Sequence, residues 1–362
     1  YITLDDINVY SSLQADPQSF IASLQKPVAI DEVQKAPDML SSIKLAVDNE
    51  RINGNFLLTG SANIMGYKNI TDTLAGRIAL LELMPLSLRE IAGSTDSLLD
   101  MMFSGEITKK KGPLITKQEI IRKVIRGWYP EIQKINSSSG HYQWFSSYIK
   151  NYIERDVRDI GELRNIDKFI KMYSLLASRS GNLLNKTDIA RDAGINFKTF
   201  DNYLELLKLV YQISLLKPYH ANIDKRLIKT EKLFFMDSGI LAFLLNITTE
   251  SEFIASPYRG NLFETFVFAE LLKDVKYSEK NAGLFYFRTS DYQEIDFIVE
   301  RGSEIIAVEV KLSESIRKDD FRHISFLQSK IKNMVAGYVV YLGNAVLPFG
   351  KDLYAIPVNL LN

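Results

Sequence analysis

Val28-Ala29-Ile30-Asp31-Glu32 decides how the N-terminal region folds, because an apolar run here ends directly in two acidic residues. A helical pattern over Met39–Asn49 follows, and then a second apolar run, Asn55–Thr59. A strand, a helix and another strand in this order predict a parallel sheet. We expect a third strand of this region over Ile78–Leu83.

The composition of the chain excludes several classes of protein. Lys+Arg and Asp+Glu both number 44, so the net charge is zero and a nucleic-acid partner must be met by a local patch. The absence of cysteine excludes disulfides, disulfide-linked partners and cysteine-ligated zinc. There is no apolar stretch of about 18 residues and no signal peptide, so we expect a cytoplasmic protein without a membrane partner.

Four regions differ in the pattern of their sequence. Residues 1–95 alternate strands and helices, residues 96–160 are helical and basic, and residues 246–362 return to an α/β pattern. Within residues 161–245, Asn185–Ile195 and Phe197–Leu209 predict two helices joined by a turn, and a hairpin with basic residues follows. This order is typical of a winged helix, a module that binds DNA in some proteins and protein in others.

The acidic pair after the first strand suits nucleotide hydrolysis. Asp31 can hold Mg²⁺, and Glu32 can polarise the water that attacks the γ-phosphate of ATP. Thr59 and Asn63 follow the neighbouring strand, where they can hold that water or sense the phosphate. Arg77 can stabilise the charge of the transition state, or it can pair with a local acid for structural reasons. Taken alone, the acidic pair is also compatible with a polar loop.

A second group of ionisable residues lies in the C-terminal region. Glu264 falls in a helical pattern, Asp296 in a strand, and Glu309 and Lys311 on one side of the next strand. Glu264, Asp296 and Glu309 can bind Mg²⁺, and Lys311 can orient or deprotonate an attacking water. The alternative is a buried Glu309–Lys311 ion pair that serves the structure alone.

These motifs together resemble the bacterial and archaeal AAA+ type ATPases that carry a C-terminal domain of unknown function 4143. Asp31–Pro37 is similar to the family's Walker B strand and the loop after it, and Leu57–Asn63 is similar to its sensor strand. The order Glu, Asp, Glu-x-Lys resembles the PD-(D/E)XK nuclease superfamily, whose fold the ATPase family is thought to carry. Further matches are Leu74–Arg77, Tyr152–Val157, Lys225–Lys229 and Phe263–Val267.

The resemblance implies an α/β multidomain protein. Its parts are a partial P-loop NTPase (AAA+) parallel sheet over residues 1–95, a helical lid or linker over 96–160, a winged-helix-like domain over 161–245, and a PD-(D/E)XK nuclease-like α/β domain over 246–362. The implied cofactors are ATP and Mg²⁺, and the implied partners are DNA and further copies of the chain. Arg77 then acts in the site of a neighbouring subunit.

Two functions follow from this resemblance. In the first, ATP hydrolysis is coupled to nucleic acid through a nuclease-like domain, which is itself a candidate Mg²⁺-dependent nuclease. In the alternative, the chain is a nucleotide-gated regulatory module that binds DNA or protein and whose nuclease-like fold is inert.

The chain departs from the family in the loop that binds phosphate. The sequence contains no Gly-x-x-x-x-Gly-Lys-Ser/Thr loop, which the family has before the position of Tyr1. The backbone N–H groups and the lysine of such a loop supply most of the contacts to the phosphates. We therefore predict that the 362-residue chain binds ATP weakly or not at all in isothermal titration calorimetry. Tight binding would contradict this prediction.

Overall fold

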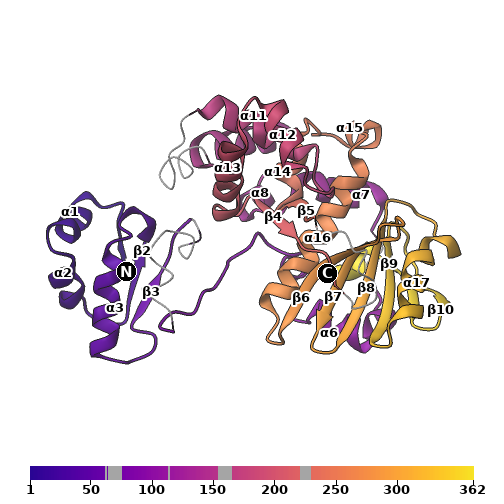
Figure 1. The fold of residues 1–362 in the computed structure, drawn as a ribbon, viewed down its shortest axis with the longest axis horizontal. Coiled ribbons are helices and arrows are strands. Elements are labelled where there is room, and N and C mark those ends of the chain that lie inside the picture. The colour runs from indigo at the N-terminus through magenta and orange to yellow at the C-terminus, as the bar shows by residue number, and fades with distance from the viewer. Residues whose placement is uncertain (62, 64–75, 113–114, 154–164, 221–229) are drawn as a thin grey trace. The chain divides into compact units, whose positions relative to one another are not determined.

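We describe the fold from a computed structural model (Figure 1), which covers residues 1–61, 63, 76–112, 115–153, 165–220 and 230–362. The chain forms two compact units. The smaller unit comprises Tyr1–Glu82, Ser147–Phe169 and Asp201–Gln212. The larger unit comprises Leu83–Ser146, Ile170–Phe200 and Ile213–Asn362.

A parallel sheet of three strands, in the order β1-β2-β3, lies in the smaller unit. Ile2 pairs with Ile30, and Val28 pairs with Phe56. The side chain of Ile30 is fully buried in a hydrophobic core, to which α1, α2 and α3 also contribute side chains. The elements are β1 (Ile2–Thr3), α1 (Ile7–Ala15), α2 (Pro17–Ser23), β2 (Val28–Asp31), η1 (Val33–Lys35), α3 (Met39–Asn49) and β3 (Phe56–Leu58).

The sequence predicted two of these strands and the helix between them, and they are confirmed as β2, α3 and β3. The prediction of a strand over Ile78–Leu83 is wrong, because these residues have no regular structure. Leu81 and Leu83 are 88% and 96% exposed. Among the described residues the sheet ends at β3, so this apolar run has no neighbouring strand to bond its backbone N–H and C=O groups.

Short helices make up the middle of the chain. Two of them were expected around Gly194, and they are confirmed as α12 and α13. The side chain of Asn185 accepts a hydrogen bond from the N–H of Asp188 at the start of α12, and Gly194 ends that helix with a φ of 69°. The helices are α5 (Leu88–Ala92), α6 (Leu98–Ser104), η3 (Glu106–Lys109), α7 (Lys117–Arg126), α8 (Pro130–Lys134), α9 (Ser138–Ser147), the π-helix η4 (Tyr148–Ile153), α11 (Ile166–Ala177), α12 (Lys186–Ala193) and α13 (Phe197–Leu209).

An antiparallel hairpin of β4 (Ile213–Leu216) and β5 (Lys232–Phe235) confirms the two strands expected there. Lys225, Arg226 and Lys229, which were expected to form a basic wing, lie outside the described residues, as do Leu74, Ala75 and Glu154–Val157 from the family motifs. The hairpin is followed by the helices α14 (Ser238–Leu244), α15 (Glu250–Ala255) and α16 (Arg259–Tyr277).

The C-terminal part contains a six-stranded mixed sheet in the order β10-β11-β9-β8-β7-β6. Its first four strands in the chain match four runs that the sequence predicts to be strands, which are Leu284–Arg288, Glu294–Val299, Ile305–Leu312 and Val335–Leu342. Phe297 contacts Phe268 of α16, whereas the next residue, Ile298, packs in the core under α17. Since alternate residues face opposite sides, α16 and α17 cover opposite faces of the sheet. The elements are β6 (Ala282–Arg288), β7 (Glu294–Arg301), β8 (Glu304–Lys311), η5 (Lys318–Phe321), α17 (Arg322–Lys330), β9 (Met334–Tyr341), β10 (Leu347–Gly350), β11 (Leu353–Pro357) and η6 (Val358–Leu361).

Helix α16 carries a buried ion pair that holds an earlier segment of the chain in place. Lys273 and Glu270 are 1% and 2% exposed and lie 2.8 Å apart. Lys273 also donates a hydrogen bond to the carbonyl of Leu86, and Glu270 accepts one from the N–H of Leu88. Each charge is therefore paired and hydrogen-bonded, as a buried charge requires.

Replacing one member of this pair should destabilise the larger unit. We predict that Lys273→Ala lowers the free energy of unfolding by about 3–5 kcal/mol, because it leaves Glu270 buried without its cation. Chemical denaturation followed by circular dichroism measures this loss. The control is Lys276→Ala on the same helix, where the exposed position should change the value by less than about 0.5 kcal/mol. Equal losses in the two variants would contradict the prediction.

Candidate functional site

Asp31 and Thr59 lie side by side where β2 and β3 end. The hydroxyl of Thr59 donates a hydrogen bond to the carboxylate of Asp31, and the hydroxyl of Tyr1 donates a second one over 2.6 Å. The bond from Thr59, followed by that from Tyr1, holds the pKa of Asp31 below its ordinary value. Two of the residues that the sequence singled out therefore meet, and the carboxylate is ionised at neutral pH.

Glu32, the next residue, has an unusual backbone conformation. Its φ and ψ of 60° and 39° lie in the left-handed region, which a residue other than glycine seldom adopts. Residues held in this way are frequent at functional sites. Burial, followed by the charge of Asp5, raises the pKa of the Glu32 carboxyl.

Gln34 is a contact of this site that the sequence analysis missed. Its side-chain amide donates hydrogen bonds to the carboxylate of Glu32 and, over 3.1 Å, to the hydroxyl of Ser61. A Cβ atom at Gly60 would collide with the side-chain amide of Gln34, so a larger residue there would displace that amide. A signal for Gln34 was present in the sequence, since it stands two residues after the acidic pair.

Arg77 and Asn63 contact other residues of the smaller unit. Arg77 forms a two-pronged ion pair with Asp48 of α3, with N–O distances of 2.6 and 3.2 Å. This is the structural alternative that the sequence left open. The backbone N–H of Asn63 donates a hydrogen bond to the carbonyl of Leu209 over 2.9 Å. Roles for Arg77 and Asn63 toward a nucleotide remain predictions.

The second candidate site lies on β7 and β8. The two strands pair as far as Phe297 and Val308, and beyond this point the carboxylate of Asp296 accepts a hydrogen bond from the N–H of Val310 over 2.8 Å. Lys311 lies 2.8 Å from Glu309, so the two side chains share one side of the strand as period two predicted. One carboxylate oxygen of Glu309 is buried without a hydrogen-bond partner.

Lys232, at the start of β5, joins this site, and the sequence analysis did not anticipate it. Its side chain is 3% exposed, and its ammonium nitrogen lies 2.7 Å from Glu294 and 3.4 Å from Glu264 of α16. Glu294 pairs in addition with Arg288 over 3.1 Å. The available signal was a lysine that opens an otherwise apolar strand, Lys232–Phe235.

Burial and mutual repulsion change how these acids titrate. Burial raises the pKa of Glu264 to about 8 and that of Glu309 to about 8, and the charge of Asp296 adds to both shifts. Burial also raises the pKa of Asp296. For Lys232 burial acts to lower the pKa, but Glu264, Asp296 and Glu294 outweigh it, so the pKa lies above its ordinary value.

The predicted metal ligands do not form a ligand group in this arrangement. Within the described ranges, no three or more His, Asp or Glu side chains are placed so that they could hold a metal ion. Glu264 and Glu309 contact lysines, and Asp296 contacts a backbone N–H. As the residues stand, they do not fit a bound Mg²⁺.

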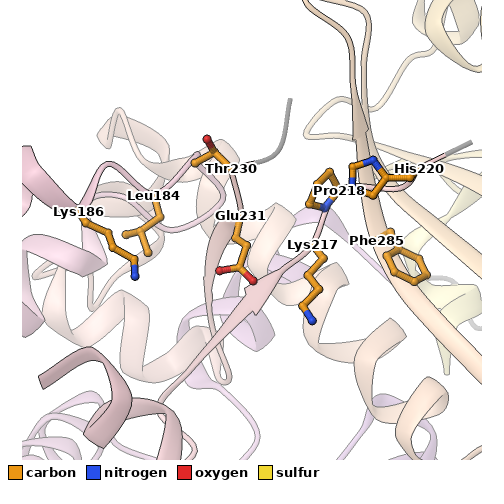
Figure 2. Close-up of a pocket in the computed structure, with 8 residues that line it drawn as sticks. All are labelled: Leu184, Lys186, Lys217, Pro218, His220, Thr230, Glu231 and Phe285. Atoms are coloured by element: carbon orange, nitrogen blue, oxygen red, sulfur yellow. The ribbon is translucent and has the colours of Figure 1, made fainter. Parts of the chain in front are cut away.

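A pocket of about 460 Å³ lies beside the β4–β5 hairpin (Figure 2). None of the residues predicted from the sequence lines it. Glu231 borders the pocket, whereas its neighbour Lys232 contacts the acids described above. The residues that line it are Leu184, Lys186, Lys217, Pro218, His220, Thr230, Glu231 and Phe285.

The basic stretch of the helical region makes contacts within the protein. Arg126 donates hydrogen bonds to the carbonyls of Ile132, Gln133 and Ile135. Lys110 contacts the last residue of the chain, Lys117 lies 3.5 Å from Glu314, and Arg122 pairs with Glu250. These basic side chains are therefore engaged within the protein.

Three family models match the chain. The AAA domain matches residues 1–92, a domain of unknown function, DUF8612, matches residues 117–251, and the domain of unknown function DUF4143 matches residues 259–361. The chain carries an AAA domain followed by a DUF4143 domain. The first candidate site lies in the AAA domain, and Glu264, Asp296, Glu309 and Lys311 lie in the DUF4143 domain.

Several uncharacterized proteins are similar in sequence over most of the chain. Uncharacterized proteins of Mycobacterium bovis and Mycobacterium tuberculosis are each 25% identical over 345 residues, which are 95% of this chain and 71% of theirs. An uncharacterized protein of Methanocaldococcus jannaschii is 26% identical over 85% of this chain and 70% of its own. The similarity does not assign a function.

Among solved structures, the Thermococcus gammatolerans assembly of McrB AAA+ hexamers with bound McrC was found. The similarity has a TM-score of 0.22 at 12% identity and covers 54% of this chain and 48% of that one. No helix in the described part of the chain is long and apolar enough to cross a membrane.

The raised pKa of Glu264 in the DUF4143 domain should make stability depend on pH. The carboxyl binds its proton more tightly in the folded state, with a pKa of about 8, than at its ordinary value of 4.5. Stability is therefore lost as the pH rises through this window. We predict that wild-type protein loses stability relative to Glu264→Gln between these values and that the difference levels off above about pH 8.

Thermal unfolding at a series of pH values measures this difference, with the exposed Glu279→Gln as the control. A difference between wild type and Glu264→Gln that does not change with pH would contradict the prediction.

Proposed function

We propose that the AAA domain hydrolyses ATP with Mg²⁺ at the ends of β2 and β3, in the manner expected of a Walker B strand. The contact between Asp31 and Thr59 supports this proposal most directly, because it joins an ionised carboxylate and a hydroxyl where two parallel strands end. Ligands commonly bind outside the carboxyl ends of such strands. The AAA family match over residues 1–92 supports the same class of function.

The residues of this site would have different roles in ATP hydrolysis. Asp31 and Thr59 offer the oxygen atoms that Mg²⁺ prefers, so they fit the ion and would hold it directly or through water. Bound Mg²⁺ neutralises charge on the phosphates. Glu32, with its raised pKa, is suited to take a proton from the attacking water. Thr59 or Asn63 would sense the γ-phosphate.

Arg77 would serve the site of a neighbouring subunit in a homo-oligomer. A guanidinium that approaches the transferred phosphate stabilises the charge of the transition state. In this structure Arg77 pairs with Asp48, so it would have to exchange that carboxylate for the phosphate.

For the DUF4143 domain we propose a nuclease-like fold that binds its partner without cleaving it. Support for the fold comes from a helix-borne glutamate, Glu264, that accompanies Asp296 and the Glu309–Lys311 pair on adjoining strands. Binding without cleavage is favoured because these acids do not form a metal-ligand group among the described residues. DNA is the proposed partner, with the winged-helix-like segment beside it as a second contact, and nucleotide at the AAA domain would gate binding.

The competing function is Mg²⁺-dependent cleavage of nucleic acid. The contact of Lys311 with Glu309 favours it, because a lysine there can orient an attacking water. Incubation with supercoiled plasmid, linear duplex and single strands in Mg²⁺ or Mn²⁺ tests it, with Lys311→Ala as the control against a contaminating nuclease. We predict no cleavage by the wild-type protein. Cleavage that disappears in Lys311→Ala would establish the competing function.

Hydrolysis at the AAA domain should depend on Glu32. In a protein that carries these residues together with the Gly-rich phosphate loop of the family, we predict that Glu32→Gln lowers kcat for ATP hydrolysis by about 10²–10⁴-fold, because the general base is lost. Nucleotide binding should change little. Release of phosphate measures the rate.

The matched control is Glu50→Gln, an exposed acid of the same domain. A rate in Glu32→Gln that equals the rate in the control would exclude Glu32 as the base.

A further inference from the structure

The side chain of Gln34 joins the two loops that follow β2 and β3 in the AAA domain. Its amide nitrogen carries two hydrogens, and both are used. One is donated to the carboxylate of Glu32, and the other is donated over 3.1 Å to the hydroxyl of Ser61. Glu32 follows directly after β2, and Ser61 lies in the loop after β3. One partly buried side chain therefore connects the acid to the end of the neighbouring strand.

The orientation of the Gln34 amide follows from its partners. An ionised carboxylate accepts hydrogen bonds and donates none, so the amide nitrogen rather than the amide oxygen faces Glu32. The oxygen then lies against Gly60, where a Cβ atom would collide with it. Among the described residues this oxygen is buried without a hydrogen-bond partner. A buried acceptor left in this way lowers stability, so the arrangement favours a role for Gln34 other than stability.

Backbone hydrogen bonds fix the segment from which Gln34 acts. The N–H of Val33 donates to the carbonyl of Thr59 over 3.1 Å, and the N–H of Thr59 donates to the carbonyl of Ile30 over 2.9 Å. The side chain of Val33 is fully buried, and Gln34 lies in the short 3-10 helix η1 that begins at Val33. The left-handed backbone of Glu32 directly precedes this helix. Gln34 thus contacts Glu32 from backbone that is bonded to the end of β3.

A general base needs a carboxylate that stays directed at the proton it removes. The carboxylate of a glutamate turns about three side-chain bonds, and a misplacement of about 1 Å can lower a rate by about 100-fold. A hydrogen bond from a second side chain that is itself held in place restricts this rotation. The amide of Gln34 bonds the Oε2 atom of Glu32, so the Oε1 atom is the one that takes the proton.

We propose that Gln34 is a positioning residue for ATP hydrolysis: its amide fixes the carboxylate of Glu32 in one orientation and ties it to Ser61 in the loop after β3. The inference rests on the function proposed above for Asp31 and Glu32. Gln34 touches neither the phosphates nor the attacking water in this proposal, and it acts through Glu32 alone.

Steady-state ATP hydrolysis tests the proposal in a protein that carries these residues together with the Gly-rich phosphate loop of the family. Gln34→Met keeps the length of the side chain and removes the amide. We expect it to lower kcat by about 10–100-fold and to leave KM for ATP within about threefold of wild type. Added to Glu32→Gln, the same substitution should lower kcat by less than about twofold more, because Gln34 acts through Glu32. Gln14→Met, at an exposed glutamine of α1, is the matched control and should change neither constant.

The contact itself is measured in the 362-residue chain without nucleotide. The side-chain amide resonances of Gln34 are assigned by nuclear magnetic resonance from their absence in Gln34→Met, and Glu32→Gln and Ser61→Ala should each shift them. Thermal unfolding shows whether the variants fold. If Gln34→Met does not fold, Ser61→Ala removes the other end of the connection and Ser61→Thr restores the hydroxyl. In that case kcat should fall at least about threefold in Ser61→Ala and return in Ser61→Thr.

Three results would overturn the proposal. One is a kcat in Gln34→Met that equals or exceeds that of the control, and another is a further large loss when Gln34→Met is added to Glu32→Gln. The third is a set of Gln34 amide resonances that respond to neither neighbouring substitution. If Glu32→Gln itself keeps the wild-type rate, the role proposed for Glu32 is wrong, and this inference is wrong with it. A loss of rate in Glu32→Gln without a loss in Gln34→Met contradicts this inference alone.

Discussion

Buried charge on helix α16 is the constraint on which the larger unit depends. A charged side chain inside a protein is tolerated when it is paired and its hydrogen bonds are satisfied. Glu270 and Lys273 meet this requirement through the backbone at Leu86 and Leu88. Asp274 meets it through an ion pair with Arg89 and a hydrogen bond from the N–H of Leu99. The helices that begin near residues 88 and 98 are thereby fixed against α16, which in turn covers one face of the six-stranded sheet.

The two candidate sites stabilise their carboxyl groups in different ways. At the AAA domain, Asp31 lies near solvent and stays ionised because hydroxyl groups donate to it. Such a carboxylate is ready for a cation from outside. In the DUF4143 domain, Glu264 and Glu309 are buried, and the protein supplies lysines of its own. The carboxylate of the first site is therefore ionised and near solvent, whereas lysines of the protein already contact the buried acids of the second site.

Many helices and strands could be predicted from local sequence patterns. Most of the features that could not be predicted depend on pairing between residues far apart in the sequence. Strand β8 was predicted from local sequence, because polar and apolar residues alternate over Ala307–Leu312, and the Glu309–Lys311 contact followed from the same period. Ile78–Leu83 looked like a strand, but a strand needs a neighbour that no local pattern reveals. Lys232 was missed because its partner Glu264 is 32 residues away and lies on a helix. Arg77 left two interpretations, since a paired and a catalytic arginine look alike in sequence.

The contacts of α16 also set the order in which the chain can fold during synthesis. Leu88 and Leu99 are separated from their partners Glu270 and Asp274 by 182 and 175 residues. A ribosome that adds about 5–20 residues per second needs on the order of 10–40 s to make this stretch. During that interval the apolar side of α6, including Leu98 and Met102, has no α16 to cover it. Nascent chains halted between these points thus expose an apolar surface to which chaperones can bind.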